Sequence, residues 1–148
     1  MRFLSLRRPW TWAIFDPIAD KGIENRSWAP PVEMIGERFA IHAAKGWDGT
    51  AVGIFLRLGI THFPGRQDLY PSGVIIGVAT LDRVVTEDRT LPPHQKRWLL
   101  GGEYGEYGWV LTDRIALPTP VPCKGAQGLR ILAMEPTVEV IRQLEALR

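Results

Sequence analysis

Side chains that could bind a phosphate or the edge of a base lie close together in the segment KGIENRSW. Apolar and polar residues alternate here, which predicts a strand with Glu24, Arg26 and Trp28 on one face. Arg26 offers a planar bidentate fork and Lys21 a mobile point charge, and both suit phosphate or a base edge. Alternatively, Glu24 and Arg26 form a partly buried ion pair that only stiffens the strand.

A second polar group follows in FAIHAAKG. The alternation predicts a strand with Phe39 and Ile41 on one face and His42 on the other, opposite the expected core. An imidazole beside the ammonium of Lys45 could serve as general acid and electrostatic clamp in phosphodiester cleavage, and Gly46 would let a ligand approach the backbone. A single histidine is more often a hydrogen-bonded structural residue, so both readings stay open.

Aromatic rings matter because unpaired bases stack on them, at roughly 1 to 3 kcal/mol per base. The chain has six tryptophans, of which Trp10 and Trp28, each next to arginine, are expected near a cleft and the others in the core. Tyr104 and Tyr107, in GEYGEYG, either close over a base or pack on the end of the sheet. Gln127, in KGAQG, either reads a base edge from the rim of the cleft or belongs to an ordinary turn.

Composition narrows the class of protein. The chain has 148 residues with 45% hydrophobic and 23% charged, as expected of one folded domain. A net charge of +2 allows nucleic acid as a partner without demanding it. Cys123 is the only cysteine, which excludes an internal disulfide and fits a reducing cytosol. No apolar run approaches the roughly 20 residues that span a bilayer, so a cytoplasmic protein is expected.

Metal and cofactor signals are weak. His62 and His94 fall in predicted loops with no carboxylate at the spacing of metal ligands. The glycines of AAKGWDGT do not follow the order of a phosphate-binding loop. We therefore predict neither a metal nor a cofactor.

The elements that must position these residues follow from periodicity and turn residues. Strands are predicted at 2–7, 23–28, 36–46, 73–85, 107–117 and 128–134, with 73–85 the most apolar and therefore central. Helices are predicted from Pro9 to Pro17, from Asp48 to Gly59, for a turn or two after Pro93, and from Pro136 onwards. In the last helix Val138, Ile141 and Leu144 are predicted to face inward.

The stretch 60–72 is predicted to be a loop, and LPTPVPCKGAQG a turn-rich connection. Several short strands with helices at the ends and at insertions predict an α+β fold in which a small sheet curls into a barrel.

Several segments in order along the chain resemble the ASCH family (activating signal cointegrator homology), a branch of the PUA-like proteins. They are LSLRRPWTWAI, KGIENRSW, FAIHAAKG, GVATLDRVV and YGWVLTDRIALPTPVPCKGAQGL. The resemblance implies one PUA-like domain over residues 1–148. Its barrel would have five or six mostly antiparallel strands, with a cleft beside the helix that follows the first strand.

The resemblance also narrows the ligand more than the reaction. PUA-like relatives bind RNA or modified bases, and ASCH-like members have been assigned as amidohydrolases on acylated cytidine or as nucleases on single-stranded RNA. The family's K-x-x-x-x-R pattern falls on Lys21 and Arg26. The amidohydrolase branch has a threonine nucleophile where this chain has Glu24. A carboxylate cannot be activated as a hydroxyl would be, which disfavours that reaction.

Three functions remain as hypotheses: a monomeric module that binds single-stranded RNA or a modified nucleotide, a hydrolase acting on RNA or an acylated nucleoside, and a protein-interaction module. The predicted ligand-binding residues are Trp10, Lys21, Asn25, Arg26, Trp28, His42, Lys45, Gly46, Tyr104, Tyr107 and Gln127. If the chain is an enzyme, the predicted catalytic residues are Lys21, Glu24, His42 and Lys45.

Overall fold

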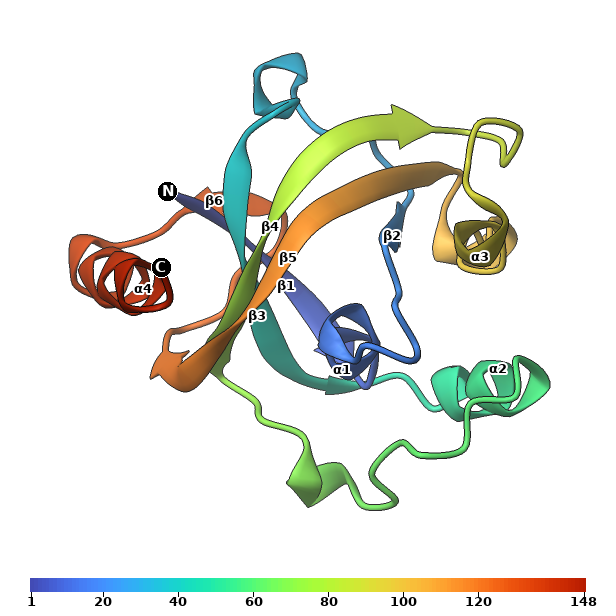
Figure 1. Cartoon of the computed structure of the whole chain (residues 1–148), viewed down its shortest axis with the longest axis horizontal. Coiled ribbons are helices and arrows are strands. Elements are labelled where there is room, and N and C mark those ends of the chain that lie inside the picture. The colour runs from blue at the N-terminus through green and yellow to red at the C-terminus, as the bar shows by residue number, and fades with distance from the viewer.

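A computed structural model describes residues 1–148 as a curled six-stranded sheet with four helices around it (Figure 1). The strands are β1 Arg2–Arg8, β2 Ile23–Arg26, β3 Arg38–Trp47, β4 Val74–Val85, β5 Tyr107–Pro122 and β6 Leu129–Ile131. The helices are α1 Trp10–Phe15, α2 Thr50–Arg57, α3 Pro93–Lys96 and α4 Met134–Ala146. In Figure 1, α4 lies on one side of the sheet, and α2 and α3 lie on the other.

The sheet is open. Its order is β2-β5-β4-β3-β1-β6, with β1 and β3 parallel and every other pair antiparallel. The predicted α+β class, the mostly antiparallel pairing and the interior place of β4 are confirmed, but the predicted closure into a barrel is wrong. At the seam where β2 approaches β1, a side chain replaces the ladder: Arg26 Nη2 donates to the Ser5 carbonyl at 2.9 Å. Backbone pairing therefore stops at β2.

Both faces of the middle strands are covered. One face carries a core cluster with Leu4, Phe39 and Trp109, and the other carries a cluster with Phe3 and Val140, the latter from α4. His42 lies on the face of β3 opposite Phe39 and Ile41, as predicted, where its ring meets Phe3. That face is covered too, so the His42 side chain is only 1% exposed. Alternation correctly separated the two faces of β3, but it could not reveal that a distant helix covers the second one.

Of the three residues of helix α4 predicted to face inward, only Leu144 packs against the core. Val138 and Ile141 are 60% and 42% exposed, whereas Val140 and Gln143 are buried. Gln143 takes the place of a neighbouring strand, because its amide accepts from the Thr119 N–H at 3.0 Å and donates to the Thr119 carbonyl at 2.8 Å. Because the polar residue Gln143 lies at the centre of the contact between α4 and β5, the pattern of apolar residues alone did not indicate which face of the helix is buried.

Strand β5 is longer than predicted. The stretch 117–122, read as a turn-rich connection because of its prolines, continues the strand to Pro122. The ladder between β4 and β5 passes directly from Gly77 opposite Ala116 to Ile75 opposite Val121. The intervening residues form a bulge without paired rungs, where prolines remove no ladder hydrogen bond.

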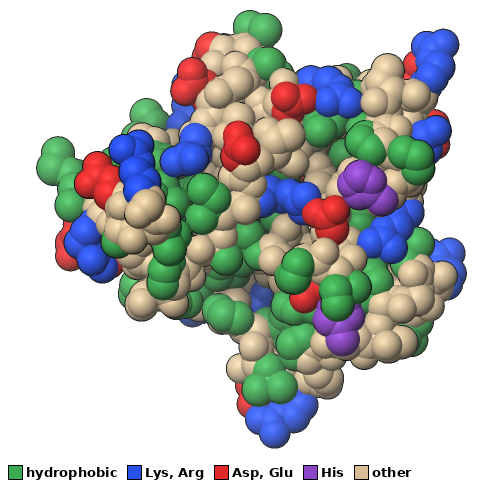
Figure 2. Space-filling view, viewed as in Figure 1, with side chains coloured by type: hydrophobic (Ala, Val, Ile, Leu, Met, Phe, Trp, Pro, Cys, Tyr) green, Lys and Arg blue, Asp and Glu red, His purple; other side chains and the backbone are tan.

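None of the four helices is long and apolar enough to cross a bilayer. On the face shown in Figure 2, basic and acidic side chains are interspersed. A third core cluster, which includes Trp10, Phe55 and Trp98, packs α1 and α2 against the segment after α3. This cluster supports one wall of the site described next.

Candidate functional site

A cavity of about 380 Å³ opens at the seam between β1 and β2, and we call it the seam cavity. Its lining residues come from β1, α1, the turn before β2, β2 itself, the turn into α2 with its first residue, and the segment after α3. They are Ser5, Leu6, Arg7, Trp10, Lys21, Glu24, Asn25, Arg26, Asp48, Thr50, Leu100, Glu103 and Tyr104. The cavity thus brings together five of the predicted ligand-binding residues, namely Trp10, Lys21, Asn25, Arg26 and Tyr104, as well as the predicted catalytic Glu24.

The floor of the seam cavity carries a row of three charges. Lys21 Nζ lies 3.6 Å from Glu24 Oε1, and Arg26 Nε lies 3.3 Å from Glu24 Oε2. The Lys21 side chain is 1% exposed, and its ammonium donates to the Ile23 carbonyl and lies 5.4 Å from the centre of the Trp10 ring. Burial lowers the pKa of Lys21, while the charge of Glu24 opposes that shift. The ion pair between Glu24 and Arg26, expected as the alternative to ligand binding, is present, and both residues line the seam cavity.

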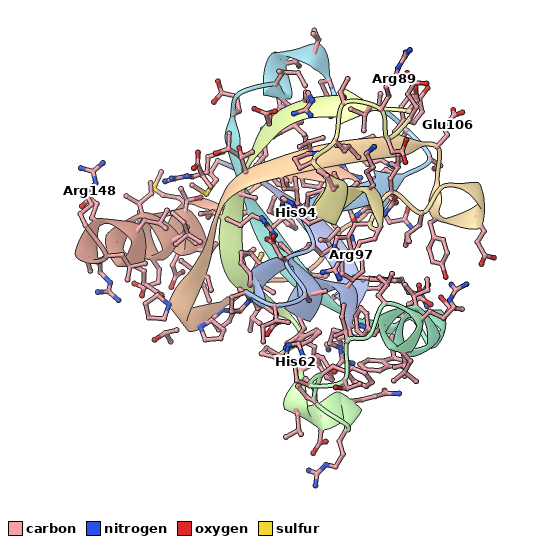
Figure 3. The ribbon with its side chains drawn as sticks, turned by 45° about the vertical axis from the view of Figure 1, so that its right-hand side comes forward. His62, Arg89, His94, Arg97, Glu106 and Arg148 are labelled. Carbon is pink, nitrogen blue, oxygen red and sulfur yellow. The ribbon has the colours of Figure 1, made fainter.

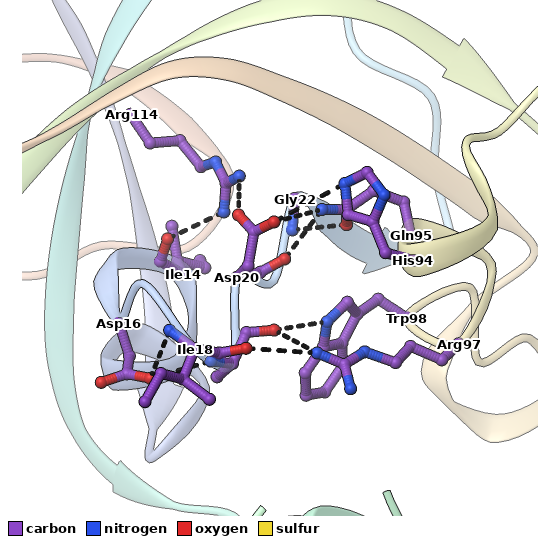
Figure 4. Close-up of polar contacts among 11 residues, drawn as sticks. Ile14, Asp16, Ile18, Asp20, Gly22, His94, Gln95, Arg97, Trp98 and Arg114 are labelled. Carbon is purple, nitrogen blue, oxygen red and sulfur yellow. Dashed lines mark hydrogen bonds and ion pairs between the residues drawn. The ribbon is translucent and has the colours of Figure 1, made fainter.

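The turn that presents Lys21 is fixed by a network around Asp20 (Figure 4). The Asp20 carboxylate accepts from Arg114, which also donates to the Ile14 carbonyl at 3.0 Å. His94 lies 3.6 Å from the other carboxylate oxygen. Asp20 has φ of +47°, a left-handed conformation that costs energy for most residues and that aspartate tolerates better than most. The turn is therefore held by side chains from β5 and α3.

Gln95 is hydrogen-bonded to the backbone of the residues just before and just after Lys21. Its amide oxygen accepts from the Gly22 N–H at 2.9 Å, and its amide nitrogen donates to the Asp20 carbonyl at 2.8 Å. A Cβ at Gly22 would lie 2.9 Å from the Gln95 oxygen, so only glycine fits without a shift. Residues of α3, far from Lys21 in sequence, thus set the position of its backbone.

Two histidines flank α1 and clamp the same connection (Figure 3). His62 Nε2 lies 2.6 Å from Asp16 Oδ2, which also accepts the Ala19 N–H at 2.8 Å. His94 approaches Asp20 as described above. His62 lies in a loop, as predicted, whereas His94 lies on α3 and not in a loop. Each histidine is the partner of an aspartate in the turn.

Asn25 lines the seam cavity, but both ends of its side-chain amide are already hydrogen-bonded to the backbone. Its nitrogen donates to the Trp98 carbonyl, and its oxygen accepts from the Leu100 N–H, both at 2.9 Å. At the end of β2, Gly105 has φ of +111°, and a Cβ there would lie 2.2 Å from the Arg26 carbonyl carbon. The backbone of β2 is thus held close to Gly105, where only glycine fits.

Aromatic side chains form part of the wall. Trp10 is 8% exposed, its Nε1 donates to Asp48 at 2.9 Å, and its ring meets Tyr104 edge-on with 5.9 Å between centres. The Tyr104 hydroxyl lies 2.6 Å from Thr50 Oγ1. Tyr107, by contrast, packs against the core cluster inside the sheet. The two tyrosines therefore differ: Tyr104 lies at the cavity, where it could close over a base, and Tyr107 packs on the sheet.

A second hollow, of about 1000 Å³, adjoins the seam cavity and shares Ser5, Arg7 and Arg26 with it. We call it the cationic hollow because four cations and no carboxylate line it. Those cations are Arg7, Arg26, Lys45 and Lys124. Trp28, His42 and Gln127 of the predicted set also line it. Gly46, the remaining predicted residue, lines neither space and is exposed beside the Arg7 side chain.

Sequence reasoning missed Ser5, Arg7, Asp48 and Thr50 as lining residues. The only available signal was the pair of arginines before Pro9, which marks basic residues at the end of a strand. The neighbouring Arg8 faces elsewhere and binds the carbonyls of Lys45, Gln67 and Tyr70. Alternation along β1 places these two arginines on opposite faces, but it does not show which face borders the cavity.

His42 has both ring nitrogens hydrogen-bonded to the protein. Nδ1 lies 2.9 Å from Ser5 Oγ, and Nε2 lies 2.7 Å from the Cys123 carbonyl. Because a carbonyl can only accept, Nε2 carries the proton and the Ser5 hydroxyl donates to Nδ1. This neutral tautomer satisfies all three groups. A Cβ at Gly125 would lie 2.8 Å from the ring, so the 123–126 segment packs directly on it.

Burial lowers the pKa of His42 from its ordinary value of 6.5, and the Cys123 hydrogen bond only partly opposes this. Well above pH 6.5 the ring is neutral whether the chain is folded or not. Below it, the unfolded chain takes up a proton that the folded one resists, so the free energy of unfolding falls as pH drops through this window. Urea unfolding at pH 7 and pH 5 should show a smaller loss for His42→Gln than for the unchanged protein. Equal losses would contradict this account.

Comparisons with known proteins show what the chain is similar to. No family model matches it, and neither does any curated protein. The crystal structure of ASCH from Zymomonas mobilis matches with a TM-score of 0.58 and 20% identity, over 95% of this chain and 93% of that chain. Two variants of that protein also match, with TM-scores of 0.58 and 0.55 at 19% identity. In one a serine is replaced by alanine, with 95% of this chain and 94% of that chain covered. In the other a tyrosine is replaced by phenylalanine, with 95% and 96% covered.

Proposed function

We propose that this chain, which has the fold of an ASCH domain, binds a nucleotide or single-stranded RNA across the two adjoining spaces. A base occupies the seam cavity, and a neighbouring phosphate occupies the cationic hollow. Arg7 and Arg26, which line both spaces, lie at the junction between base and phosphate.

The observation that carries the proposal is the difference in charge between the two spaces. The seam cavity is balanced, with the cations Arg7, Lys21 and Arg26 and the carboxylates Glu24, Asp48 and Glu103. The cationic hollow has four cations and no carboxylate. A phosphate is therefore attracted to the cationic hollow, whereas a neutral, hydrogen-bonding group suits the balanced cavity.

The shape of the seam cavity supports the same assignment. Its volume of about 380 Å³ lies within the roughly 300 to 1000 Å³ typical of small-molecule sites. The Trp10 ring and the Tyr104 ring, set edge-on to each other, give it flat apolar surface against which a base can pack. A single strand is favoured over a duplex because a base must leave the stack to enter the cavity.

The features of His42 favour binding over cleavage. A general acid must offer its proton to the leaving group, and the only N–H of this ring points at the Cys123 carbonyl. Lys45 is exposed at the cationic hollow, where its charge suits a phosphate. Cleavage remains a distinct outcome of the experiment that follows.

The test is a titration of the protein with fluorescent single-stranded RNA, duplex RNA and single-stranded DNA at two salt concentrations. The recovered RNA is then run on a gel. Binding of single-stranded RNA that weakens with salt, with the RNA left intact, supports the proposal. Cut RNA replaces it with a nuclease, and absence of binding to all three overturns it.

Replacing Lys45 with alanine should weaken binding of single-stranded RNA without altering which sequences are preferred. Removing one phosphate contact lowers the slope of log affinity against log salt by about 0.7 for a single strand. Lys96→Ala is the matched control, because Lys96 is an exposed lysine that lines neither space. Equal salt slopes for the two variants would remove Lys45 from the interface.

A further inference from the structure

We infer that the seam cavity selects guanine, whose N1–H and N2–H groups donate to the two carboxylate oxygens of Glu24. The inference rests on the proposed function, since it names the base that the same cavity takes. It begins from the unused hydrogen-bonding capacity of a carboxylate on the cavity floor.

Neither of the cations beside Glu24 makes a short, well-aligned hydrogen bond to its carboxylate. The distance from Oε1 to Lys21 is 3.6 Å, and the contact from Oε2 to Arg26 Nε, at 3.3 Å, lacks the alignment of a hydrogen bond. The Glu24 side chain is 10% exposed, so its carboxylate is not sealed in the protein. It lines the seam cavity. An ionised carboxylate offers about four acceptor positions, and here a ligand can reach them.

The carboxylate is also held in one orientation. Glu24 and Trp109 face each other across the β2–β5 ladder, so the Glu24 side chain points to the inner face of the sheet, where Trp109 is fully buried. The two cations lie one at each oxygen, and each uses one of its donors on a backbone carbonyl. Lys21 donates to the Ile23 carbonyl and Arg26 to the Ser5 carbonyl. The cations thus compensate the charge of Glu24 and leave acceptor positions of its carboxylate open to a ligand.

The other carboxylates of the cavity do not offer the same site. Asp48 accepts from Trp10 Nε1 at 2.9 Å with one oxygen, and from the Thr50 N–H and hydroxyl with the other. Glu103 is exposed at the rim. Glu24 is the carboxylate of this cavity that is both nearly buried and free to accept.

Two oxygens side by side match two donors side by side. Guanine is the standard base with adjacent N–H donors on its Watson–Crick edge, at N1 and at the 2-amino group. Adenine and cytosine present one amino group next to a ring nitrogen with a lone pair, which a carboxylate oxygen would repel. Uracil presents a single N–H between two carbonyls. A matched bidentate pair discriminates against the wrong base by roughly 10-fold to 100-fold.

The test compares the Kd values of GMP, AMP, CMP and UMP for the whole chain in the same buffer. GMP is expected to bind roughly 10-fold to 100-fold more tightly than the other three. Inosine monophosphate, which lacks only the 2-amino group, should lose part of this preference. Glu24→Gln replaces one acceptor with a donor and should abolish the preference. The matched control Glu106→Gln should keep it, since Glu106 is exposed and lies outside both spaces (Figure 3).

The outcomes separate this inference from the function on which it rests. Salt-dependent binding of all four nucleotides with equal Kd overturns the guanine assignment and leaves the proposed function standing. Absence of binding to every nucleotide and to RNA overturns both. If Glu24→Gln fails to fold, as judged by its thermal unfolding, the GMP and inosine comparison on the unchanged protein still decides, because equal affinities for the two contradict a role for the 2-amino group.

Discussion

Lys21→Met is expected to lower the free energy of unfolding by about 3 kcal/mol, the lower end of the range for breaking a buried ion pair. The methionine fills a similar volume, so the loss comes from electrostatics and hydrogen bonding rather than from a void. It leaves the Ile23 carbonyl without its donor and Glu24 with one cation instead of two. Urea unfolding measures the change. The loss stays at the lower end because Arg26 still compensates the carboxylate.

A double-mutant cycle tests the cause. Glu24→Gln in the Lys21→Met background should recover part of the lost stability, because the charge that needed compensation is gone. Lys45→Met serves as control and should change stability by no more than about 0.5 kcal/mol, as is usual for an exposed position. If Lys21→Met unfolds at the same urea concentration as the unchanged protein, the pair on the cavity floor does not stabilise the fold.

Trp98→Ala is expected to cost about 3 to 5 kcal/mol, the usual loss when a buried aromatic side chain is removed. Trp98 is fully buried and meets Phe55 edge-on, and its Nε1 donates to the Ala19 carbonyl at 2.9 Å. Its own carbonyl accepts from Asn25 at 2.9 Å. One residue therefore connects the turn before Lys21 to β2. Since domains of this kind are stable by only about 5 to 15 kcal/mol, the loss is a large share of the total.

Two further variants separate the ring from its hydrogen bond. Trp98→Phe keeps an aromatic ring in the core, and Arg97 still donates to the Ala19 carbonyl at 2.8 Å, so the loss should be about 1 kcal/mol. Trp47→Ala removes a half-buried ring and should cost clearly less than Trp98→Ala. Urea unfolding followed by the fluorescence of the remaining tryptophans measures all three. Equal losses at positions 47 and 98 would contradict the account.

The sequence predicted local structure well where a single period decides it. Each of the six strands and four helices was expected close to where it lies, because alternation or helical spacing is visible within each segment. The wrong predictions concern contacts between distant segments, which the periodicity of one segment does not reveal. Gln143 binding the backbone of Thr119 decides which side of α4 is buried, and the bulge after Ala116 keeps prolines within β5. Both depend on residues distant in sequence.

The site was predictable by residue type but not by role. Lys21, Glu24 and Arg26 were expected together because they share one short strand and the turn before it. The hydrogen bonds of two polar side chains could not be predicted, because every partner comes from a remote segment. Asn25 binds the backbone of Trp98 and Leu100, and His42 binds Ser5 and Cys123. Polar residues in a cleft thus divide into those that hold the fold and those free for a ligand, and only tertiary contacts separate them.

The open seam has a consequence for how tightly any ligand is held. Strand β2 is four residues long and is hydrogen-bonded as a strand only to β5, yet it carries Glu24 and Arg26. Short edge elements are where native proteins open locally, and their amide hydrogens exchange early. The measured affinity is therefore the intrinsic affinity reduced by the fraction of molecules in which β2 is in place. A ligand that contacts both β1 and β2 would connect two strands that share no backbone hydrogen bonds. It would therefore slow the hydrogen exchange of the β2 amides.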